Sequence, residues 1–592
     1  MRIFYSGTVS ENLLRLRSLA ECFGIETTLV DVRAHQSLTA ALKKVMAQGD
    51  ASLVLDAESL KDGSNLDELD EVAGLLGSCD ATVLLFATGD HELTNRFLRT
   101  LTGGAVHEVN RTACATSIRF PVSGSRLSGE LASQTYPRQS KEALTLTVAH
   151  GGGTDLIMEL DASPSFAHFR SGRARIFVWS TASVFDVHRR LEAEKEFEVA
   201  SDEYIPAIIF LRSAYREHCW HNPRVGAGII IDDPLLKKRY GFIHFPELLA
   251  SARKHSYHVT LAFIPWNHWR SRSKAVKMFL EHSDCFSICA HGCDHTRNEF
   301  RSDDYESLLR KNFVARRRMQ RHRERTGLGF EPLMVCPQEQ YSLEAMRAFS
   351  DSRQFLGLVN TACMPRNLTA NQPCGADLLL PAQDSFFGFP VFKRHYWKDM
   401  SVFAMGLFLG KPAILVEHHE FFRDGPAGAE EFVSRLAEMR PAVKWTPLSE
   451  TVTRTHLRRR LPNGNREVRF FTDTFHLEHE VERATEYRLI RRVPATTAVR
   501  HVTVNGNVAP FTRENGLLTC YVRVERPQSL EVRVVVMPVE PTKAYSSGLT
   551  YCASVAVRRG FSELRDNVLA RNRFALKAGK SLTKAWNHAC GK

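Results

Sequence analysis

The chain has 592 residues, of which 43% are hydrophobic and 24% are charged. This is the composition of an ordinary globular protein, and it excludes fibrous and intrinsically disordered chains. Single hydrophobic cores stop growing at about 250 to 300 residues, so we expect two to four domains. The formal net charge of +12 favours an anionic partner. No nucleic-acid-binding motif accompanies the basic stretches, so we expect no nucleic acid partner.

The sequence also carries signals of cellular location. Residues 1–24 contain no long apolar run and no small-residue cleavage site, so they do not predict a secretory signal. No segment approaches the roughly 18 consecutive apolar residues of a membrane-spanning helix. The 13 cysteines lie mostly in apolar contexts, which is typical of buried thiols in a reducing compartment. We therefore predict a cytoplasmic protein.

The first third of the chain predicts an α/β domain. Residues 1–110 alternate short β-branched runs with amphipathic stretches, which is the rhythm of an open α/β sheet. Residues 111–200 are richer in strand-like segments. We predict one N-terminal domain over residues 1–200, either in one piece or in two parts divided near residue 110. No motif indicates its role.

A second α/β region covers residues 201–447. Helical segments separate its strand candidates, which are residues 226–232, 258–264, 285–291, 332–337, 355–360 and 413–418. Parallel strands that alternate with helices and end in polar residues predict a (β/α) barrel whose site lies at the carboxyl ends of the strands.

Beyond residue 447 the apolar residues recur with period two. The turn Asn505-Gly506 lies between two apolar runs and favours a hairpin. We predict a β-sandwich over residues 448–545, with either a glycan-binding or a packing role. Residues 546–592 predict a basic helical tail that docks on the protein itself or makes peripheral contact with a membrane surface.

Chemistry-bearing side chains follow the predicted barrel strands. Asp232 and Asp233 come at the end of the first strand, where burial of two adjacent carboxylates without a cation is costly. His291 ends the third strand, and His295 follows four residues later. With 24 histidines in the chain, one such pair is expected by chance, so its position after a buried strand is what gives it weight. These four side chains predict a metal site.

The last predicted strand, residues 413–418, delivers His418 and His419 to the same edge. The order strand-Asp-Asp, strand-His-Gly-x-x-His, Pro-containing loop, strand-His is similar to that of the polysaccharide deacetylase (NodB-like, carbohydrate esterase) family. The resemblance covers about residues 205–445. It implies a distorted (β/α) barrel of NodB type, a divalent metal such as zinc, and removal of N- or O-acetyl groups from sugars.

The resemblance also implies individual roles. Asp233, His291 and His295 correspond to the metal ligands, Asp232 to the general base, and His418 to the general acid. The chemistry of the residues agrees with these roles, because one carboxylate and two imidazoles leave positions on Zn²⁺ open for water and for an acetyl oxygen. A carboxylate beside the metal can take a proton from that water.

The chain departs from the family in one loop. The family's arginine, which orients the base, has no counterpart in residues 335–339, so another group must act on Asp232. His419 is the alternative to His418 as the acid. Cys293, between the two metal histidines, is either an extra ligand or a small buried residue.

Candidates for substrate binding lie on two loops. Residues 264–270 follow another predicted strand, and Trp266 and Trp269 there are candidates for stacking on sugar rings, with Asn267 between them. Packing is an equally open role for these residues. Arg297, just after His295, either binds substrate hydroxyls or solvates its loop.

We predict a metal-dependent deacetylase that acts on an N-acetylated sugar or glycan. A hydrolase of a non-sugar amide is an alternative, since the loop without its arginine permits another substrate. A catalytically inactive scaffold that binds glycans or assembles with partners is a second alternative. The missing arginine favours the scaffold, whereas two adjacent aspartates at a strand end argue against it.

Overall fold

The computed structural model describes residues 1–49, 52–61, 67–149, 154–366, 368, 372–543 and 548–571. The chain divides into two compact units, which we describe separately. The first comprises residues 1–221, 372–380 and 458–467, and the second comprises residues 222–371, 381–457 and 468–592. The domain boundaries near residues 200, 447 and 545 stay predictions. None of the described helices combines the length and apolarity that a transmembrane helix requires.

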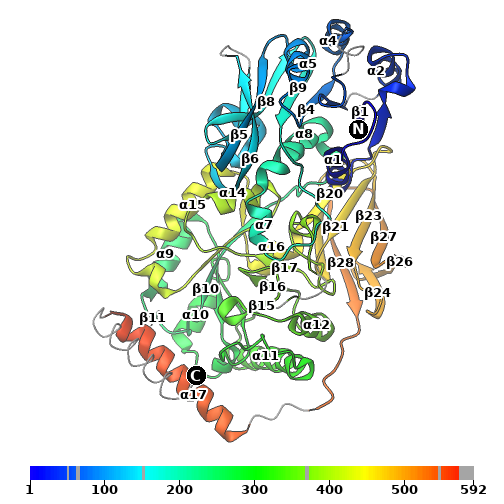
Figure 1. Cartoon of the computed structure of the whole chain (residues 1–592). Helices are drawn as coiled ribbons and strands as arrows, with labels where there is room; N and C mark the ends of the chain where they lie inside the picture. The colour runs from blue at the N-terminus through cyan, green and yellow to red at the C-terminus, as the bar shows by residue number, and fades with distance from the viewer. Residues whose placement is uncertain are drawn as a thin grey trace. The chain divides into compact units, whose positions relative to one another are not determined.

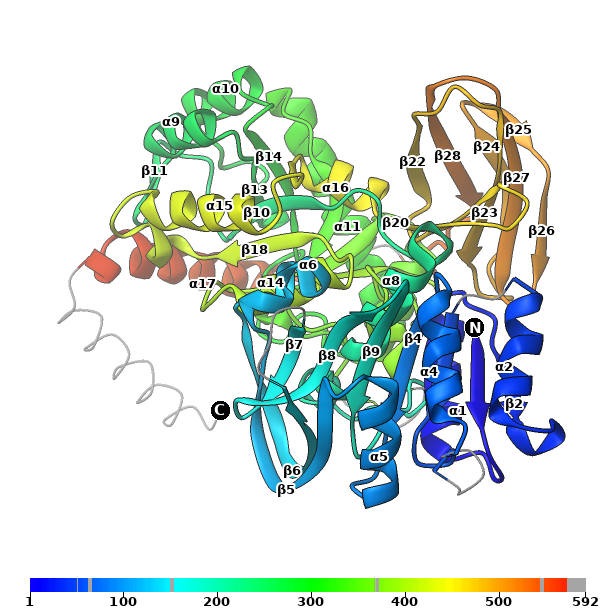
Figure 2. The ribbon, with the colours of Figure 1, turned by 90° about the horizontal axis from the view of Figure 1, so that it is seen from above.

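The first unit is built on one mixed sheet. Its strands are β1 (Arg2–Tyr5), β2 (Thr28–Asp31), β3 (Ser52–Asp56), β4 (Thr82–Ala87), β5 (Val106–Arg119), β6 (Thr135–Val148), β7 (Asp155–Leu160), β8 (Ser163–Ser171) and β9 (Ala174–Ser180). They follow the order β2-β1-β3-β4-β9-β8-β7-β5-β6, parallel as far as β9 and antiparallel beyond it (Figure 2). One sheet therefore contains strands from both sides of residue 110.

Helices accompany this sheet. They are α1 (Glu11–Cys22), α2 (Leu38–Ala47), α4 (Leu69–Ser78), α5 (Glu92–Leu101), α6 (Ser125–Ser128), α7 (Glu194–Glu198), α8 (Ile205–Tyr215) and α13 (Gly375–Leu378). Strand β20 (His456–Arg460) lies mostly within the same unit. Buried side chains of β3 and β4 pack with those of α2 and α4 in one hydrophobic cluster, which is what the alternation of β-branched and amphipathic segments predicts.

The second unit contains a curled parallel sheet. Its strands are β10 (Gly226–Asp232), β13 (Val259–Phe263), β14 (Phe286–His291), β15 (Glu331–Val335), β16 (Gly357–Asn360), β17 (Val391–Lys393), β18 (Ala413–Glu417) and β19 (Lys444–Trp445). They follow the order β17-β16-β15-β14-β13-β10-β18, with β19 beside β10. A parallel bridge joins His395, just after β17, to Leu415 in β18, so the two edges of the sheet approach each other. This curled sheet agrees with the predicted barrel.

The sequence explains why these strands are central. All seven residues of β10 are buried, and its three consecutive isoleucines fit a strand that is covered on both faces. The covering helices are α9 (Phe245–His255), α10 (Ser273–Glu281), α11 (Tyr305–Thr326), α12 (Leu343–Ser352), α14 (Ser401–Phe408), α15 (Ala427–Met439) and α16 (Leu448–Arg454) (Figure 1). A short hairpin, β11 (Arg239–Tyr240) and β12 (Ile243–His244), lies in the loop after β10.

The rest of the second unit consists of antiparallel strands and one helix. The strands are β21 (Arg466–Phe470), β22 (Thr474–His479), β23 (Thr485–Arg492), β24 (Val499–Val504), β25 (Asn507–Ala509), β26 (Phe511–Glu514), β27 (Leu517–Val524) and β28 (Gln528–Val536). β23, β27 and β26 belong to one sheet, and β22, β28, β24 and β25 form another. Buried residues of both sheets share one hydrophobic cluster. Helix α17 (Leu549–Asn567) follows these strands.

Candidate metal centre

The predicted site residues come from strands that are neighbours in the curled sheet. β10 lies between β18 and β13, and β14 follows β13 in the same parallel direction. Because the carboxyl ends of parallel strands meet at one edge, Asp232, His291 and His418 are delivered to the same edge. The sheet thus brings together residues that are up to 186 positions apart in the sequence.

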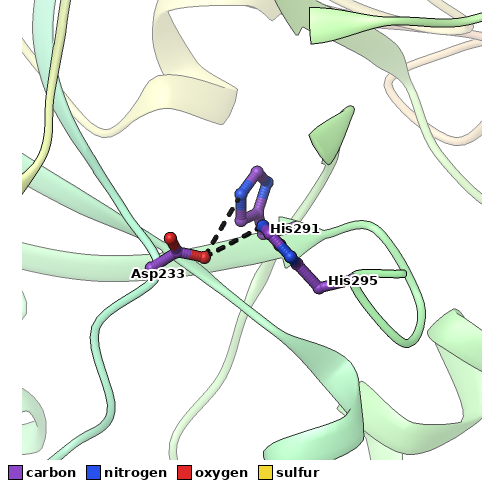
Figure 3. Close-up of side chains that lie close together, drawn as sticks. All are labelled: Asp233, His291 and His295. Carbon is purple, nitrogen blue, oxygen red and sulfur yellow. Dashed lines mark ion pairs between the residues drawn. The ribbon is translucent and has the colours of Figure 1, made fainter. Parts of the chain in front are cut away.

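Asp233, His291 and His295 form a compact triad (Figure 3). Asp233 Oδ1 lies 3.0 Å from His295 Nε2 and 3.7 Å from His291 Nε2. One ligand atom from each residue lies within 4.8 Å of the other two. Oδ1 is buried and has no aligned hydrogen-bond donor among the described residues. One carboxylate oxygen and two imidazole nitrogens aimed at a common point fit a divalent ion such as zinc.

The protonation state of the triad also fits a cation. Nδ1 of His291 lies 3.1 Å from the Val335 carbonyl oxygen, which can only accept, so Nδ1 donates and Nε2 keeps its lone pair. Burial lowers the pKa of His291 to about 4, so the ring is neutral near pH 7. Burial would raise the pKa of Asp233, but His295 and His291 hold it well below its ordinary value. Metal binding requires both of these forms.

The loop after β14 holds His295 in place through Glu299. The buried Glu299 carboxylate accepts hydrogen bonds from the backbone N–H groups of Cys293, Asp294 and His295 at 2.8 to 3.1 Å. His295 has a backbone φ of +54° and Asp233 one of +81°. Residues other than glycine seldom adopt positive φ values. Strain of this kind persists where the surroundings impose it, and it concentrates at functional sites.

Asp232 points to a different partner. Arg394, one residue beyond β17, donates to both carboxylate oxygens at 2.8 Å, and both side chains are buried. Burial would raise the pKa of Asp232, but the Arg394 guanidinium, with His291 and His418, lowers it below its ordinary value. Asp232 is therefore an ionised, oriented carboxylate next to the triad. The sequence analysis missed Arg394, whose only local signal is its position at the end of a three-residue strand.

The two adjacent histidines after β18 lie in different surroundings. His418 is close enough to Asp232 for its charge to act on that carboxylate, and its ring stacks on Tyr396 with centroids 6.0 Å apart. His419 is buried, packs near the Tyr240 ring, and places Nε2 3.5 Å from a carboxylate oxygen of Asp566. Of these two histidines, His418 is the one whose charge acts on Asp232.

A carboxylic acid lies beside His418. Glu417 is the last residue of β18 and accepts a hydrogen bond from the backbone N–H of Trp397. Burial raises its pKa to about 7, so it exchanges its proton near neutral pH. The sequence analysis assigned no role to it.

The predicted substrate-binding residues divide into buried and exposed ones. Trp266 is partly buried, with the Arg318 guanidinium 4.9 Å from its ring centroid. Asn267 is fully buried and accepts a hydrogen bond from Arg270. Trp269 is 61% exposed, and Arg297 is exposed. Only these last two lie free for a ligand in the arrangement observed.

No protein-family model and no curated protein matches the chain. Solved structures do. Agd3, a carbohydrate deacetylase, is 10% identical, with a TM-score of 0.44 over 90% of this chain and 99% of its own. A family 4 carbohydrate esterase from Streptomyces lividans in complex with acetate is 14% identical, with a TM-score of 0.22 over 36% of this chain and 87% of its own.

A family 4 carbohydrate esterase from Bacillus anthracis is 12% identical, with a TM-score of 0.25 over 38% of this chain and 83% of its own. These solved structures are of the class that the sequence resemblance indicates. At such low identities and TM-scores they carry no information about the chemistry of this chain. Its function has to be inferred from its own residues.

Proposed function

We propose that the chain is a metal-dependent hydrolase that removes acetyl groups from an N-acetylated sugar or glycan. The observation that carries the proposal is the triad of Asp233, His291 and His295 beside the arginine-paired carboxylate of Asp232. A divalent ion, zinc or a similar one, would lower the pKa of a bound water and polarise the acetyl carbonyl.

The chain's own groups would then move the protons. Asp232 is ionised and held by Arg394, so it accepts the proton of the attacking water. His418 donates a proton to the leaving nitrogen, and Glu417 beside it exchanges protons near pH 7. His295 and Asp233 keep their geometry through the loop of Glu299 and through their own constrained backbone.

Substrate contacts are part of the same proposal. Trp269 is the exposed aromatic ring for a sugar face, and Arg297 is an exposed donor for hydroxyl groups. Trp266 and Asn267 support that loop from inside, since one packs beneath Arg318 and the other bonds to Arg270. The antiparallel sheets after β20 would form the β-sandwich that accompanies the barrel.

The test combines elemental analysis with acetate release. Protein purified without chelator is expected to hold about one equivalent of a divalent metal and to release acetate from N-acetylglucosamine oligomers. D233A should lose the metal, whereas D232N should keep it and lose acetate release by about 10²- to 10⁴-fold. Metal without acetate release would favour another amide substrate. Absence of metal would favour the inactive scaffold.

We also propose that helix α17 contacts an anionic membrane surface. Val557, Phe561 and Leu564 of the helix, and Val568 directly after it, recur at helical spacing and are 47% to 67% exposed. The sequence that follows carries further lysines and arginines, which suit acidic headgroups. Co-sedimentation with phosphatidylglycerol vesicles should exceed that with phosphatidylcholine vesicles, and F561S should weaken it. Equal binding to both vesicles would contradict the proposal.

A further inference from the structure

Helix α17 lies over the same edge of the curled sheet that carries the triad. Asp566 accepts a hydrogen bond from the Tyr240 hydroxyl at 2.7 Å, and Asn567 accepts one from the backbone N–H of Gly241 at 2.9 Å. At the other end of the helix, Tyr551 donates to Asp294 at 2.8 Å. These partners lie in the loops after β10 and β14 (Figure 1).

Further contacts come from the remaining loops of that edge. Glu563 pairs with Lys237 at 3.2 Å and also with Arg270, which follows β13. His419, which follows β18, lies 3.5 Å from Asp566. The helix therefore bridges the loops of four adjacent strands. It forms part of the wall around the metal centre.

The inner face of the helix presents Val555, Arg559 and Asp566, which are its buried residues. Arg559 is only 2% exposed. Its Nε has no hydrogen-bond partner, and none of the described residues forms an ion pair or hydrogen bond with its guanidinium. Its charge acts on both Asp233 and Tyr240, so this buried guanidinium lies near the triad. A buried guanidinium without partners is costly unless a ligand supplies acceptors.

The charges around the centre indicate what that ligand is. A divalent ion held by one carboxylate and two neutral imidazoles leaves one positive charge, and Arg559 adds a second. The nearby acids are already committed, since Asp232 pairs with Arg394, Asp566 with Arg565, and Asp294 with Arg318. A neutral acetylated sugar would leave this excess positive charge uncompensated in a buried site.

We propose that Arg559 binds an anionic group of the substrate, so that the substrate is an N-acetylated sugar that carries a carboxylate or a phosphate. This inference rests on the proposed function for the acetylated sugar, but Arg559 itself is assigned from its burial and from the absence of a hydrogen-bonded partner among the described residues. Arginine suits this role because its planar fork matches both carboxylate and phosphate oxygens.

Binding can be measured separately from turnover. The full chain, loaded with zinc or treated with chelator, is titrated by calorimetry with N-acetylglucosamine, N-acetylglucosamine 6-phosphate and N-acetylmuramic acid. The first is neutral, the second carries a phosphate and the third a carboxylate. We expect at least one of the anionic sugars to bind the zinc-loaded protein about tenfold more tightly than the neutral one. Whichever anionic sugar binds more tightly shows whether the preferred anionic group is a phosphate or a carboxylate.

R559M removes the guanidinium, keeps most of the buried volume, and leaves no new unpaired charge. It should abolish the preference for the anionic sugars by weakening their binding about tenfold, to the level of N-acetylglucosamine. R559Q repeats the test should R559M fail to fold, and R559K should keep most of the preference. R317Q, which changes an exposed arginine of α11, is the matched control and should behave as the native protein does.

Three results would overturn the assignment. They are equal binding of neutral and anionic sugars by the native protein, a preference that survives in R559M and R559Q, and tighter binding of every sugar when Arg559 is removed. The last result would mean that α17 is an obstructing cap. Failure of the proposed function is recognised separately, because it appears as absent metal or absent acetate release whatever the calorimetric preference.

Discussion

Two compact groups of metal-ligand side chains lie on neighbouring stretches of the second unit. The triad of Asp233, His291 and His295 has a carboxylate oxygen to which no described residue donates an aligned hydrogen bond. The second group, Cys293, Asp294 and Glu299, is equally compact. Its acids, however, already have partners.

The partners of the second group are protein groups. Arg318 donates to Asp294 and also to the carbonyl and thiol of Cys293, and Tyr551 donates to the other Asp294 oxygen. Glu299 accepts three backbone N–H groups. A built-in guanidinium thus occupies the position that a metal would need. A cluster of metal-ligand side chains is therefore not enough to indicate a metal site. The triad differs from the second group because its Asp233 oxygen is not already bonded to a described protein group.

The Asp232–Arg394 ion pair lies next to the triad, and here, too, a guanidinium already pairs with the carboxylate. R394M should lower acetate release about 100-fold at pH 6, since it leaves the base buried without its cation. Without the arginine to oppose it, burial raises the pKa of Asp232 above its ordinary value. Activity should therefore recover as the pH rises and Asp232 ionises. A pH–rate profile measures this shift. R469M, which breaks the Arg469–Asp384 pair elsewhere in the unit, should leave the profile unmoved.

R394M should also reverse the direction in which the contribution of Asp232 to the free energy of unfolding changes with pH. In the native protein the lowered pKa of Asp232 stabilises the fold above the unfolded pKa of about 4, and this contribution is lost as pH falls through the folded value. In R394M the folded pKa lies above the unfolded one, so stability is lost as pH rises instead. Urea unfolding at pH 4 and pH 7 separates the two signs. Parallel losses for native protein and variant would contradict the assignment.

Asp294, which pairs with an arginine, and Asp233 of the triad should also contribute differently to the free energy of unfolding. D294N leaves the buried Arg318 short of its counter-charge and should cost about 3 kcal/mol of unfolding free energy, with metal content retained. D233N, measured on chelator-treated protein, should cost clearly less than D294N, because no arginine or lysine loses a hydrogen-bonded partner. Urea unfolding curves give both values. Equal costs would mean that the triad is a structural ion-pair cluster and not an open ligand set.

The smallest effect is expected where the two groups meet. E299Q replaces a carboxylate that orients the His295 backbone, so zinc affinity should fall about tenfold while one equivalent still binds at saturation. Competition with a zinc-chelating dye measures the affinity. E306Q, which changes a partly exposed glutamate that also accepts a backbone N–H, is the matched control. Unchanged affinity in E299Q would show that the loop keeps His295 in place without it.

Much of the second unit could be read from local pattern. The strand predicted at residues 226–232 is β10, and the one predicted at 413–418 contains β18. Helices such as α9 and α12 lie between the strands, as the sequence predicts. These elements have clear apolar periodicity and lie between turn signals. Strand β17 was not predicted, because three residues carry no periodicity.

The chain's local sequence by itself determined that acids and imidazoles follow buried strands, and this predicted a metal site among Asp232, Asp233, His291 and His295. The family resemblance then implied which three of them are the ligands. Tertiary structure alone decided which groups stand around them. Arg394 reaches Asp232 from 162 residues away, and Arg559 reaches the same edge from a helix more than 320 residues beyond Asp233. A strand-end pattern depends on a few neighbouring residues, whereas ion pairing depends on how distant segments pack, which no local window contains.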